Sequence, residues 1–216
     1  MSNAEAGTPG QPGPTDVLAT LGHELRGPLG VARGYLRLLA QAGDLSEKQA
    51  GAVGQAARAA DRMAALLDEI SEYTRWLRGE RALAPERIAL APLAATAIAA
   101  IAPAPELRIP PDLMVDADPV RLGSALTTLA DAATRILQDL SPVAIVATPA
   151  TGTGALTITV GPAHPPAATD GEAPADLRRS GHGLGLALAD CIIRAHGGSL
   201  TERHGPQQWG GYVIRL

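Results

Sequence analysis

The chain has 216 residues, enough for one large domain or two small ones. Hydrophobic residues make up 46% and charged residues 19%, which allows a buried core and excludes wholesale disorder. The core must be mainly aliphatic, because the chain has no Phe and aromatic residues are only 2% of it. The formal net charge of −4 offers no basic surface for nucleic acid or an anionic membrane, so we expect neither partner.

The ends and the single cysteine bear on the cellular setting. Cys191 cannot form an internal disulfide, which favours a reducing, cytoplasmic location. The most apolar stretch, residues 88–102, contains proline and is mostly Ala, so it is too short and too weakly hydrophobic to span a bilayer. Residues 1–4 look like a cloning-tag remnant and residues 7–14 are Gly/Pro-rich. We therefore expect residues 1–15 to be a disordered linker.

A heptad pattern begins after Asp16, which we expect to be an N-cap. Alternating steps of three and four predict a helix with one apolar seam. The seam positions are Leu18, Leu21, Leu25, Pro28, Ala32, Tyr35 and Leu39.

A second helix is predicted from Ser46 to about Gly79, after a break at Gly43-Asp44. Its seam positions are Val53, Ala56, Ala60, Met63, Leu67, Ile70, Thr74 and Leu77. Two antiparallel helices cannot cover both seams by themselves. Residues 16–80 are therefore predicted to form a helical hairpin that pairs with a second copy as a dimeric four-helix bundle.

His23 falls at heptad position f, on the face of the first helix that points away from the seam. The segment His23-Glu24-Leu25-Arg26-Gly27-Pro28-Leu29 resembles the phosphoacceptor box of bacterial sensor histidine kinases, usually His-Glu-Leu-Arg-Thr-Pro-Leu. Six of the seven positions match. A proline inside a helix costs ~3 kcal/mol, so its place five residues after a surface histidine supports the resemblance.

The resemblance implies that a ring nitrogen of neutral His23 attacks phosphorus. Glu24 would be its hydrogen-bonding partner and base, and Arg26 and Pro28 would support the box. The one mismatch is Gly27, where the family has the Thr or Asn that orients water for dephosphorylating the partner. Glycine cannot orient water, so we expect no phosphatase activity.

Residues 81–216 have a different sequence pattern, in which short predicted strands and helices are joined by Pro/Gly-rich turns. Strands are expected at 87–90, 114–116, 142–147, 155–160 and 211–216, with a hairpin turn at 151–154, and helices at 93–101, 119–137 and 184–195. This order predicts an α/β sandwich. It also resembles the ATPase-type domain that follows the hairpin in histidine kinases, so the resemblance extends from about residue 16 to the end.

The glycines before the last predicted helix resemble the second glycine box of the family. Backbone N–H groups of such a box approach phosphate at the positive end of a helix, which implies nucleotide binding by Gly181, Gly183 and Gly185. A tight turn that requires glycine is the alternative. A dinucleotide-binding fingerprint fits poorly, because no acidic residue follows at the proper distance.

Other parts of the nucleotide site are missing from the sequence. The family's Mg²⁺-binding asparagine aligns with Ala132, which has no side-chain oxygen, and the neighbouring Asp131 points about a quarter-turn away. The adenine-binding aspartate aligns with Pro162. Residues 165–180 are short for a lid over ATP, although Arg178 and Arg179 lie there and are either solvated or in contact with phosphate.

The remaining histidines do not indicate a metal. His164, His182, His196 and His204 match no zinc spacing and lack cysteine or clustered carboxylate companions, so no metal site is expected. His196 is expected at a helix C-terminus, where a positive charge is favoured.

Three functions remain open. In the first, the chain is a degenerate histidine phosphotransferase in a phosphorelay, with a response-regulator receiver domain as partner and no tightly bound cofactor. In the second, it is a histidine autokinase that uses ATP and Mg²⁺. In the third, it is a non-catalytic dimeric scaffold. The intact box beside an eroded nucleotide site favours the first.

Overall fold

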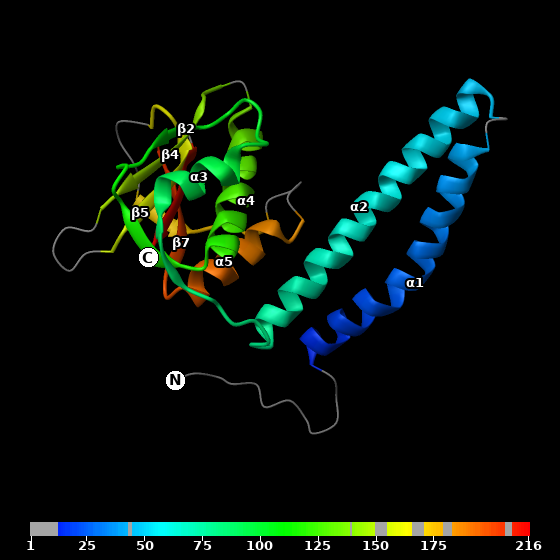
Figure 1. Ribbon diagram of the computed structural model, residues 1–216, viewed down its shortest axis with the longest axis horizontal. Coiled ribbons are helices and arrows are strands. Elements are labelled where there is room, and N and C mark those ends of the chain that lie inside the picture. The colour runs from blue at the N-terminus through cyan, green and yellow to red at the C-terminus, as the bar shows by residue number, and fades with distance from the viewer. Residues whose placement is uncertain are drawn as a thin grey trace. The chain divides into compact units, whose positions relative to one another are not determined.

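The computed structural model describes residues 13–42, 45–138, 140–149, 155–165, 171–178, 183–205 and 209–216 (Figure 1). The chain divides into two compact units, Met1–Arg81 and Ala82–Leu216. The first is a helical hairpin and the second is built on a β-sheet. Within the described residues, no helix is both long enough and apolar enough to cross a bilayer.

The hairpin consists of α1 (Pro14–Gln41) and α2 (Glu47–Leu77). The N-cap of α1 is Gly13, not Asp16, and Pro14 stands in the first turn, where its missing N–H costs nothing. Asp16 instead accepts a hydrogen bond from the Gly13 N–H at 3.2 Å. Helix α2 begins at the predicted place, and Ser46 is its N-cap, with its hydroxyl oxygen accepting from the Gln49 N–H.

The C-terminus of α2 is closed by a Schellman motif. Gly79 adopts a φ of 68°, and the N–H of Glu80 donates to the carbonyl of Arg75 at 2.9 Å. The helix therefore ends two residues before the glycine that marks its end in the sequence.

Three ion pairs link α1 to α2 in one antiparallel register. Asp16–Arg78, Arg26–Asp68 and Arg33–Asp61 join atoms 2.6, 2.9 and 2.7 Å apart. From one pair to the next, the number of residues advanced along α1 equals the number of residues moved back along α2. All three pairs therefore fit one alignment of the two helices.

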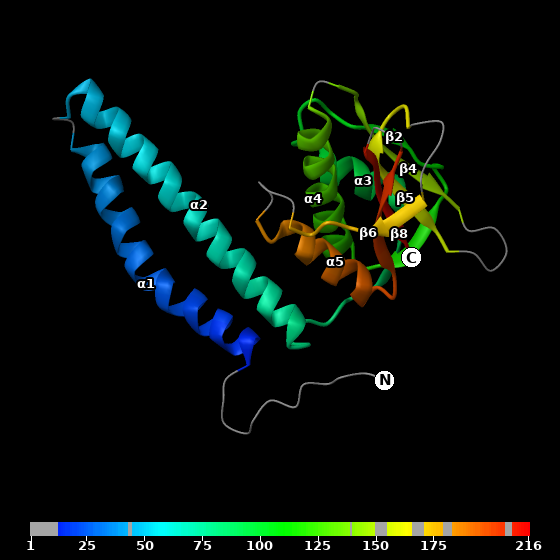
Figure 2. The ribbon, with the colours of Figure 1, turned by 180° about the vertical axis from the view of Figure 1, so that it is seen from behind.

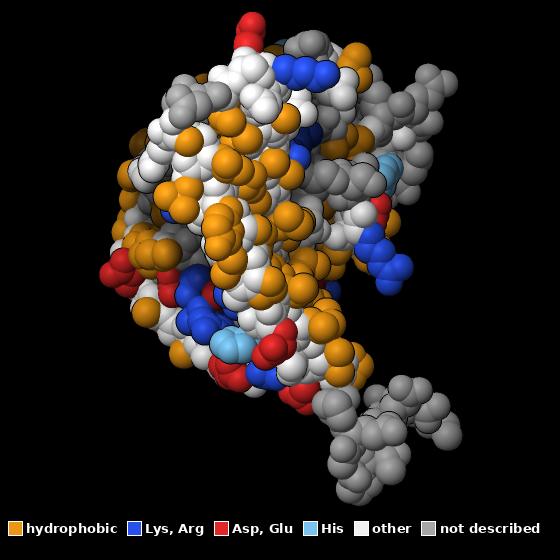
Figure 3. Space-filling model, turned by 90° about the vertical axis from the view of Figure 1, so that its right-hand side faces the viewer, with side chains coloured by type: hydrophobic (Ala, Val, Ile, Leu, Met, Phe, Trp, Pro, Cys, Tyr) orange, Lys and Arg blue, Asp and Glu red, His pale blue; other side chains and the backbone are white. Residues whose placement is uncertain are grey.

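Most of the predicted seam of α1 does not face α2. Its side chains stay exposed, from 40% at Leu18 to 65% at Tyr35, and Figure 3 shows hydrophobic side chains gathered along the hairpin. The residues of α1 that face α2 form a different stripe, next to the predicted seam on the helix surface. In this stripe Gly22 is buried, and Ala19, Leu29 and Leu36 are half-buried. On α2, three seam residues that lie seven positions apart are buried, namely Ala60, Leu67 and Thr74.

The described residues of the second unit form a mixed sheet, a separate strand pair and three helices. The strands are β1 (Glu86–Ala89), β2 (Glu106–Arg108), β3 (Met114–Ala117), β4 (Val143–Thr148), β5 (Thr157–Pro162), β6 (Gly171–Pro174), β7 (Ser199–His204) and β8 (Trp209–Arg215). Among the described residues the main sheet has the order β2-β4-β5-β8-β7-β6, with only β2 and β4 parallel, and β1 pairs with β3 separately. The helices are α3 (Leu90–Ile98), α4 (Pro119–Leu137) and α5 (Gly185–Ala195).

These helices cover one side of the main sheet, which makes a two-layer α/β sandwich (Figures 1 and 2). The core between the layers is aliphatic, as the composition requires, with Leu126 and Leu129 of α4 and Ile158 and Ile214 of the sheet fully buried. The bounds of α4 match the prediction. Helix α3 begins three residues earlier than predicted, because Pro92 is tolerated in a first turn.

Part of the segment 165–180, which is short for an ATP lid, is a strand. Residues 171–174 form β6, which pairs antiparallel with β7, while 166–170 and 179–182 lie outside the described residues. Glu172 anchors this strand: its carboxylate accepts hydrogen bonds from Arg215 at 2.7 Å, Thr201 at 2.8 Å and Arg203 at 3.2 Å. The Arg215 hydrogen bond, with help from Thr201 and Arg203 and against the effect of burial, lowers the pKa of Glu172 to about 2.

Replacing Glu172 with Gln should destabilise the α/β unit at pH 7 by about 1–3 kcal/mol, because a charged acceptor is removed from two arginines. Since the folded pKa lies below the unfolded value of about 4.3, this stabilisation is present above pH 4.3. It should disappear as the pH falls toward 2. Thermal unfolding of wild type and Glu172→Gln from pH 7 to pH 2 tests this. Glu86→Gln, at an exposed position of β1, is the control. A constant difference across the range would contradict the assignment.

Candidate functional site

The packing of α1 against α2 determines where His23 points. A Cβ atom on Gly22 would lie 3.5 Å from Ile70 and 3.6 Å from the hydroxyl of Ser71, so this position faces α2. Each residue of a helix advances by about 100°, which turns the next residue, His23, away from α2. His23 is exposed, as is the adjacent Glu24.

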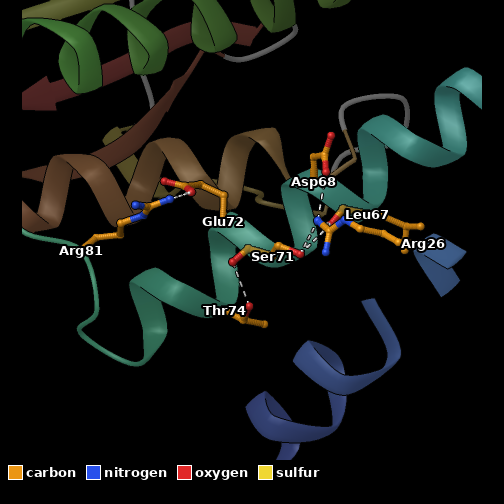
Figure 4. Close-up of polar contacts among 7 residues, drawn as sticks. All are labelled: Arg26, Leu67, Asp68, Ser71, Glu72, Thr74 and Arg81. Atoms are coloured by element: carbon orange, nitrogen blue, oxygen red, sulfur yellow. Dashed lines mark hydrogen bonds and ion pairs between the residues drawn. The ribbon is translucent and has the colours of Figure 1, made fainter. Parts of the chain in front are cut away.

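Arg26 reaches from α1 to α2, as Figure 4 shows. Its Nη2 atom lies 2.7 Å from the hydroxyl of Ser71, 2.9 Å from the carboxylate of Asp68 and 3.1 Å from the carbonyl of Leu67. The sequence did not identify Asp68 or Ser71 as part of the site. A usable signal was nevertheless present, because Asp61 and Asp68 repeat the seven-residue spacing of Arg26 and Arg33.

The backbone after His23 is weakened by Gly27 and Pro28. Pro28 lies inside α1, where it provides no N–H for the carbonyl one turn earlier. Helix α1 changes direction partway along its length (Figures 1 and 2), which is what an internal proline produces. A Cβ atom on Gly27 would meet nothing within 4 Å, so the absence of a side chain here is not imposed by crowding.

An open apolar groove of about 380 Å³ lies between the helices next to the box. It is lined by Leu25, Pro28, Leu29, Met63, Leu66 and Leu67. The exposed seam and this groove together form an apolar surface that one chain does not cover.

In the α/β unit, two of the three predicted nucleotide-binding glycines can be placed. Gly183 adopts a φ of 54°, and Gly185 is the first residue of α5. A Cβ atom on Gly185 would come within 3.1 Å of Thr128 on α4, so this glycine also allows close packing between the helices. Gly181 lies outside the described residues.

The two positions where the family has polar nucleotide ligands carry no side-chain oxygen. Ala132 is fully buried in the core face of α4, and the neighbouring Asp131 is paired with Arg135 at 2.8 Å. Pro162 ends β5. The next backbone carbonyl, that of Ala163, accepts a hydrogen bond from Arg108 at 2.8 Å. The described residues therefore do not fit Mg²⁺ and a purine in the manner of the family.

Arg178 lies near the end of a described segment, where its backbone N–H donates to the Asp176 carboxylate at 3.1 Å. Arg179 and His182 fall outside the described residues. Burial raises the pKa of the Cys191 thiol, which keeps it protonated and unreactive. Within the part of the chain that is described, no cluster of His, Cys, Asp and Glu could hold a metal ion.

His196 is the C-cap of α5, at the helix C-terminus where it was predicted. Its Nε2 atom accepts a hydrogen bond from the backbone N–H of Asp118 at 3.0 Å, and its Nδ1 atom lies 2.8 Å from the carbonyl of Ile192. His196 thus joins the end of α5 to the start of α4.

Comparison with known proteins agrees with this arrangement. Residues 15–79 match the His Kinase A (phospho-acceptor) domain. The probable sensor histidine kinase TcrY of Mycobacterium tuberculosis (strain ATCC 25618 / H37Rv) is 29% identical, over 92% of this chain and 45% of that protein. The chain thus spans less than half the length of this relative.

Two solved structures share the fold. Full-length ShkA in complex with AMPPNP matches with a TM-score of 0.71 and 24% identity, over 93% of this chain and 44% of ShkA. The histidine kinase AdeS of Acinetobacter baumannii matches with a TM-score of 0.60 and 19% identity, over 90% of this chain and 96% of AdeS. With a phosphoacceptor hairpin followed by an ATPase-type α/β domain, the chain is similar to sensor histidine kinases over both of its units.

Proposed function

We propose that His23 accepts a phosphoryl group from one receiver domain and passes it to another, without the use of ATP by this chain. The observation that carries the proposal is a contrast between the two units. The phosphoacceptor box is intact and its histidine is exposed, whereas Ala132 and Pro162 stand where the nucleotide site needs oxygen ligands.

The transfer needs an unprotonated ring nitrogen on His23 and an aspartyl phosphate on the partner. The lone pair of that nitrogen forms the N–P bond while the P–O bond to the aspartate breaks, and the electron pair leaves with the aspartate carboxylate. The other ring nitrogen gives its proton to Glu24, its neighbour in the sequence. Mg²⁺ held by carboxylates of the receiver would balance the charge on the phosphoryl oxygens, so this chain has to supply positioning.

The exposed apolar surface of the hairpin supports a homodimer as the working form. Leu21 and Leu25 are about half exposed in one chain, at 52% and 51%, and they lie on the seam that a second copy would cover. In this proposal residues 16–80 are the dimerisation and phosphoacceptor domain. Residues 81–216 are a degenerate ATPase-like domain that provides a docking surface, in a cytoplasmic setting.

ATP-dependent autophosphorylation of His23 is the second candidate. The structure of ShkA, which shares this fold, contains AMPPNP, and TcrY is named a probable sensor histidine kinase. The positive φ of Gly183 and the place of Gly185 at the start of α5 also suit a phosphate-binding turn.

A charging assay separates these candidates. We expect calorimetric titration with millimolar Mg·ATP to show no binding, because the side-chain ligands are missing. A receiver domain charged with radiolabelled acetyl phosphate should label the wild type, and the label should be acid-labile. His23→Ala should remain unlabelled, and His164→Ala, at an exposed histidine of the other unit, should be labelled like wild type. Tight Mg·ATP binding would assign the chain to the autokinases. Label that persists in His23→Ala would exclude phosphoryl transfer through His23.

The dimer can be tested through Leu25. Leu25→Asp places a charge on the exposed seam beside the apolar groove, so the dimer should dissociate to monomers at micromolar concentration in analytical ultracentrifugation. Val120→Asp, at a 74% exposed position of α4, should leave the mass unchanged. A Leu25→Asp protein that remains dimeric would place the interface elsewhere.

The open space at Gly27 allows a test of the missing phosphatase activity. Gly27→Thr introduces a hydroxyl at the family's water-orienting position and should accelerate phosphate release from a phosphorylated receiver domain. Gly27→Ala should leave that rate unchanged and stabilise the hairpin by about 0.5–1 kcal/mol in thermal unfolding. Gly30→Ala, where the space is equally open, should match Gly27→Ala in both measurements. No acceleration in Gly27→Thr would refute this explanation.

A further inference from the structure

We propose that Asp68 and Ser71 of α2 are positioning residues for His23 and that they act through Arg26. The inference rests on the proposed function, because positioning matters for transfer to or from a docked protein. It assigns a role to side chains that lie outside the phosphoacceptor box and on the other helix.

The contact is built so that Arg26 has a defined place. The Ser71 hydroxyl donates to the carbonyl of Leu67 at 2.9 Å, which leaves its lone pairs for the Arg26 guanidinium at 2.7 Å. Asp68, one turn earlier on α2, accepts from the same Nη2 atom at 2.9 Å. Arg26 is thus held between two acceptors on consecutive turns of α2 (Figure 4).

This contact lies beside the reactive residue. Arg26 follows His23 by three residues, which places the two side chains on adjacent parts of the α1 surface. One turn before Arg26, Gly22 packs against Ile70 and Ser71, so Ser71 contacts α1 at two successive turns. The rotation of α1 about its own axis at His23 is therefore defined by α2.

Helix α1 needs such a constraint because its own backbone is soft here. Gly22 and Gly27 are each less favourable in a helix than Ala, and Pro28 removes a backbone hydrogen bond. A small rotation or bend of this segment would move the exposed face of the phosphoacceptor box. It would thereby turn the His23 imidazole away from a docked aspartate. Misplacement of a reacting group by about 1 Å costs up to about 100-fold in rate.

The same contact contributes little to stability. The Arg26 and Asp68 side chains are 40% and 76% exposed, and ion pairs that are exposed to solvent contribute little to stability. Its loss should thus appear in the transfer rate and not in folding.

The hairpin contains a matched control. Arg33–Asp61 is an ion pair of similar length and exposure in the same register, seven residues further along α1. Asp61→Asn removes the same kind of interaction two turns away from Arg26. Arg26→Lys is also informative, because lysine keeps the charge but loses the planar guanidinium that donates to several acceptors at once.

The experiment charges the 216-residue chain in two ways. Phosphoramidate is a small donor that needs no docking, and a receiver domain charged with radiolabelled acetyl phosphate must align with His23. Single-turnover rates are measured for wild type, Asp68→Asn, Ser71→Ala, Arg26→Lys and Asp61→Asn, with thermal unfolding of each.

We expect equal phosphoramidate rates and closely similar unfolding in all five proteins. Transfer from the receiver domain should fall about 10-fold to 100-fold in Asp68→Asn, Ser71→Ala and Arg26→Lys, and stay at the wild-type rate in Asp61→Asn. Wild-type transfer in Asp68→Asn and Ser71→Ala would overturn the inference, as would an equal loss in Asp61→Asn. Full activity of Arg26→Lys would reduce the role of Arg26 to its charge.

A separate readout distinguishes failure of the proposed function. If receiver domains charge none of the proteins, including wild type, the phosphorelay proposal fails. The positioning role is then read from the NMR signals of the His23 imidazole. These signals should shift in Asp68→Asn and Ser71→Ala but not in Asp61→Asn, and unshifted signals would overturn the positioning role as well.

Discussion

The packing of Gly22 against Ile70 and Ser71 is the constraint on which the hairpin depends. Of the residues of α1, all of which are described, Gly22 is the buried one. The geometry of a helix fixes the directions of neighbouring side chains relative to one another. When Gly22 is buried against α2, His23 therefore points outward, and Leu21 and Leu25 lie on a third face, which is apolar. One contact therefore separates three surfaces of α1: the face toward α2, the phosphoacceptor face and the seam.

The forces that hold the hairpin together have different roles. The ion pairs between α1 and α2 are exposed and contribute little energy, but opposite charges in one register exclude a slipped alignment. The large apolar side chains supply the driving force, and in a single chain many of them remain in water. The alignment of the two helices is therefore determined within the chain, while much of the apolar surface of the hairpin stays exposed.

In the α/β unit, positions that align with the family's nucleotide ligands contribute to packing. Ala132 is part of a fully buried face of α4, so an apolar residue suits this position in the core. β6, held by Glu172, extends the sheet with residues from the segment that aligns with the family's lid. The unit has the architecture of a histidine-kinase ATPase domain.

The sequence by itself determined the helical hairpin, the outward place of His23, the bounds of α4 and the α/β class of the second unit. These follow from local periodicity, capping and motif spacing, which depend on residues close together in the chain. Only the tertiary structure decided that Arg26 binds Asp68 and Ser71, that residues 171–174 form a strand held by Glu172, and that His196 accepts a hydrogen bond from Asp118. Each contact joins residues far apart in the chain, and the sequence offered at most a seven-residue repeat of opposite charges as a signal, because such contacts arise from packing.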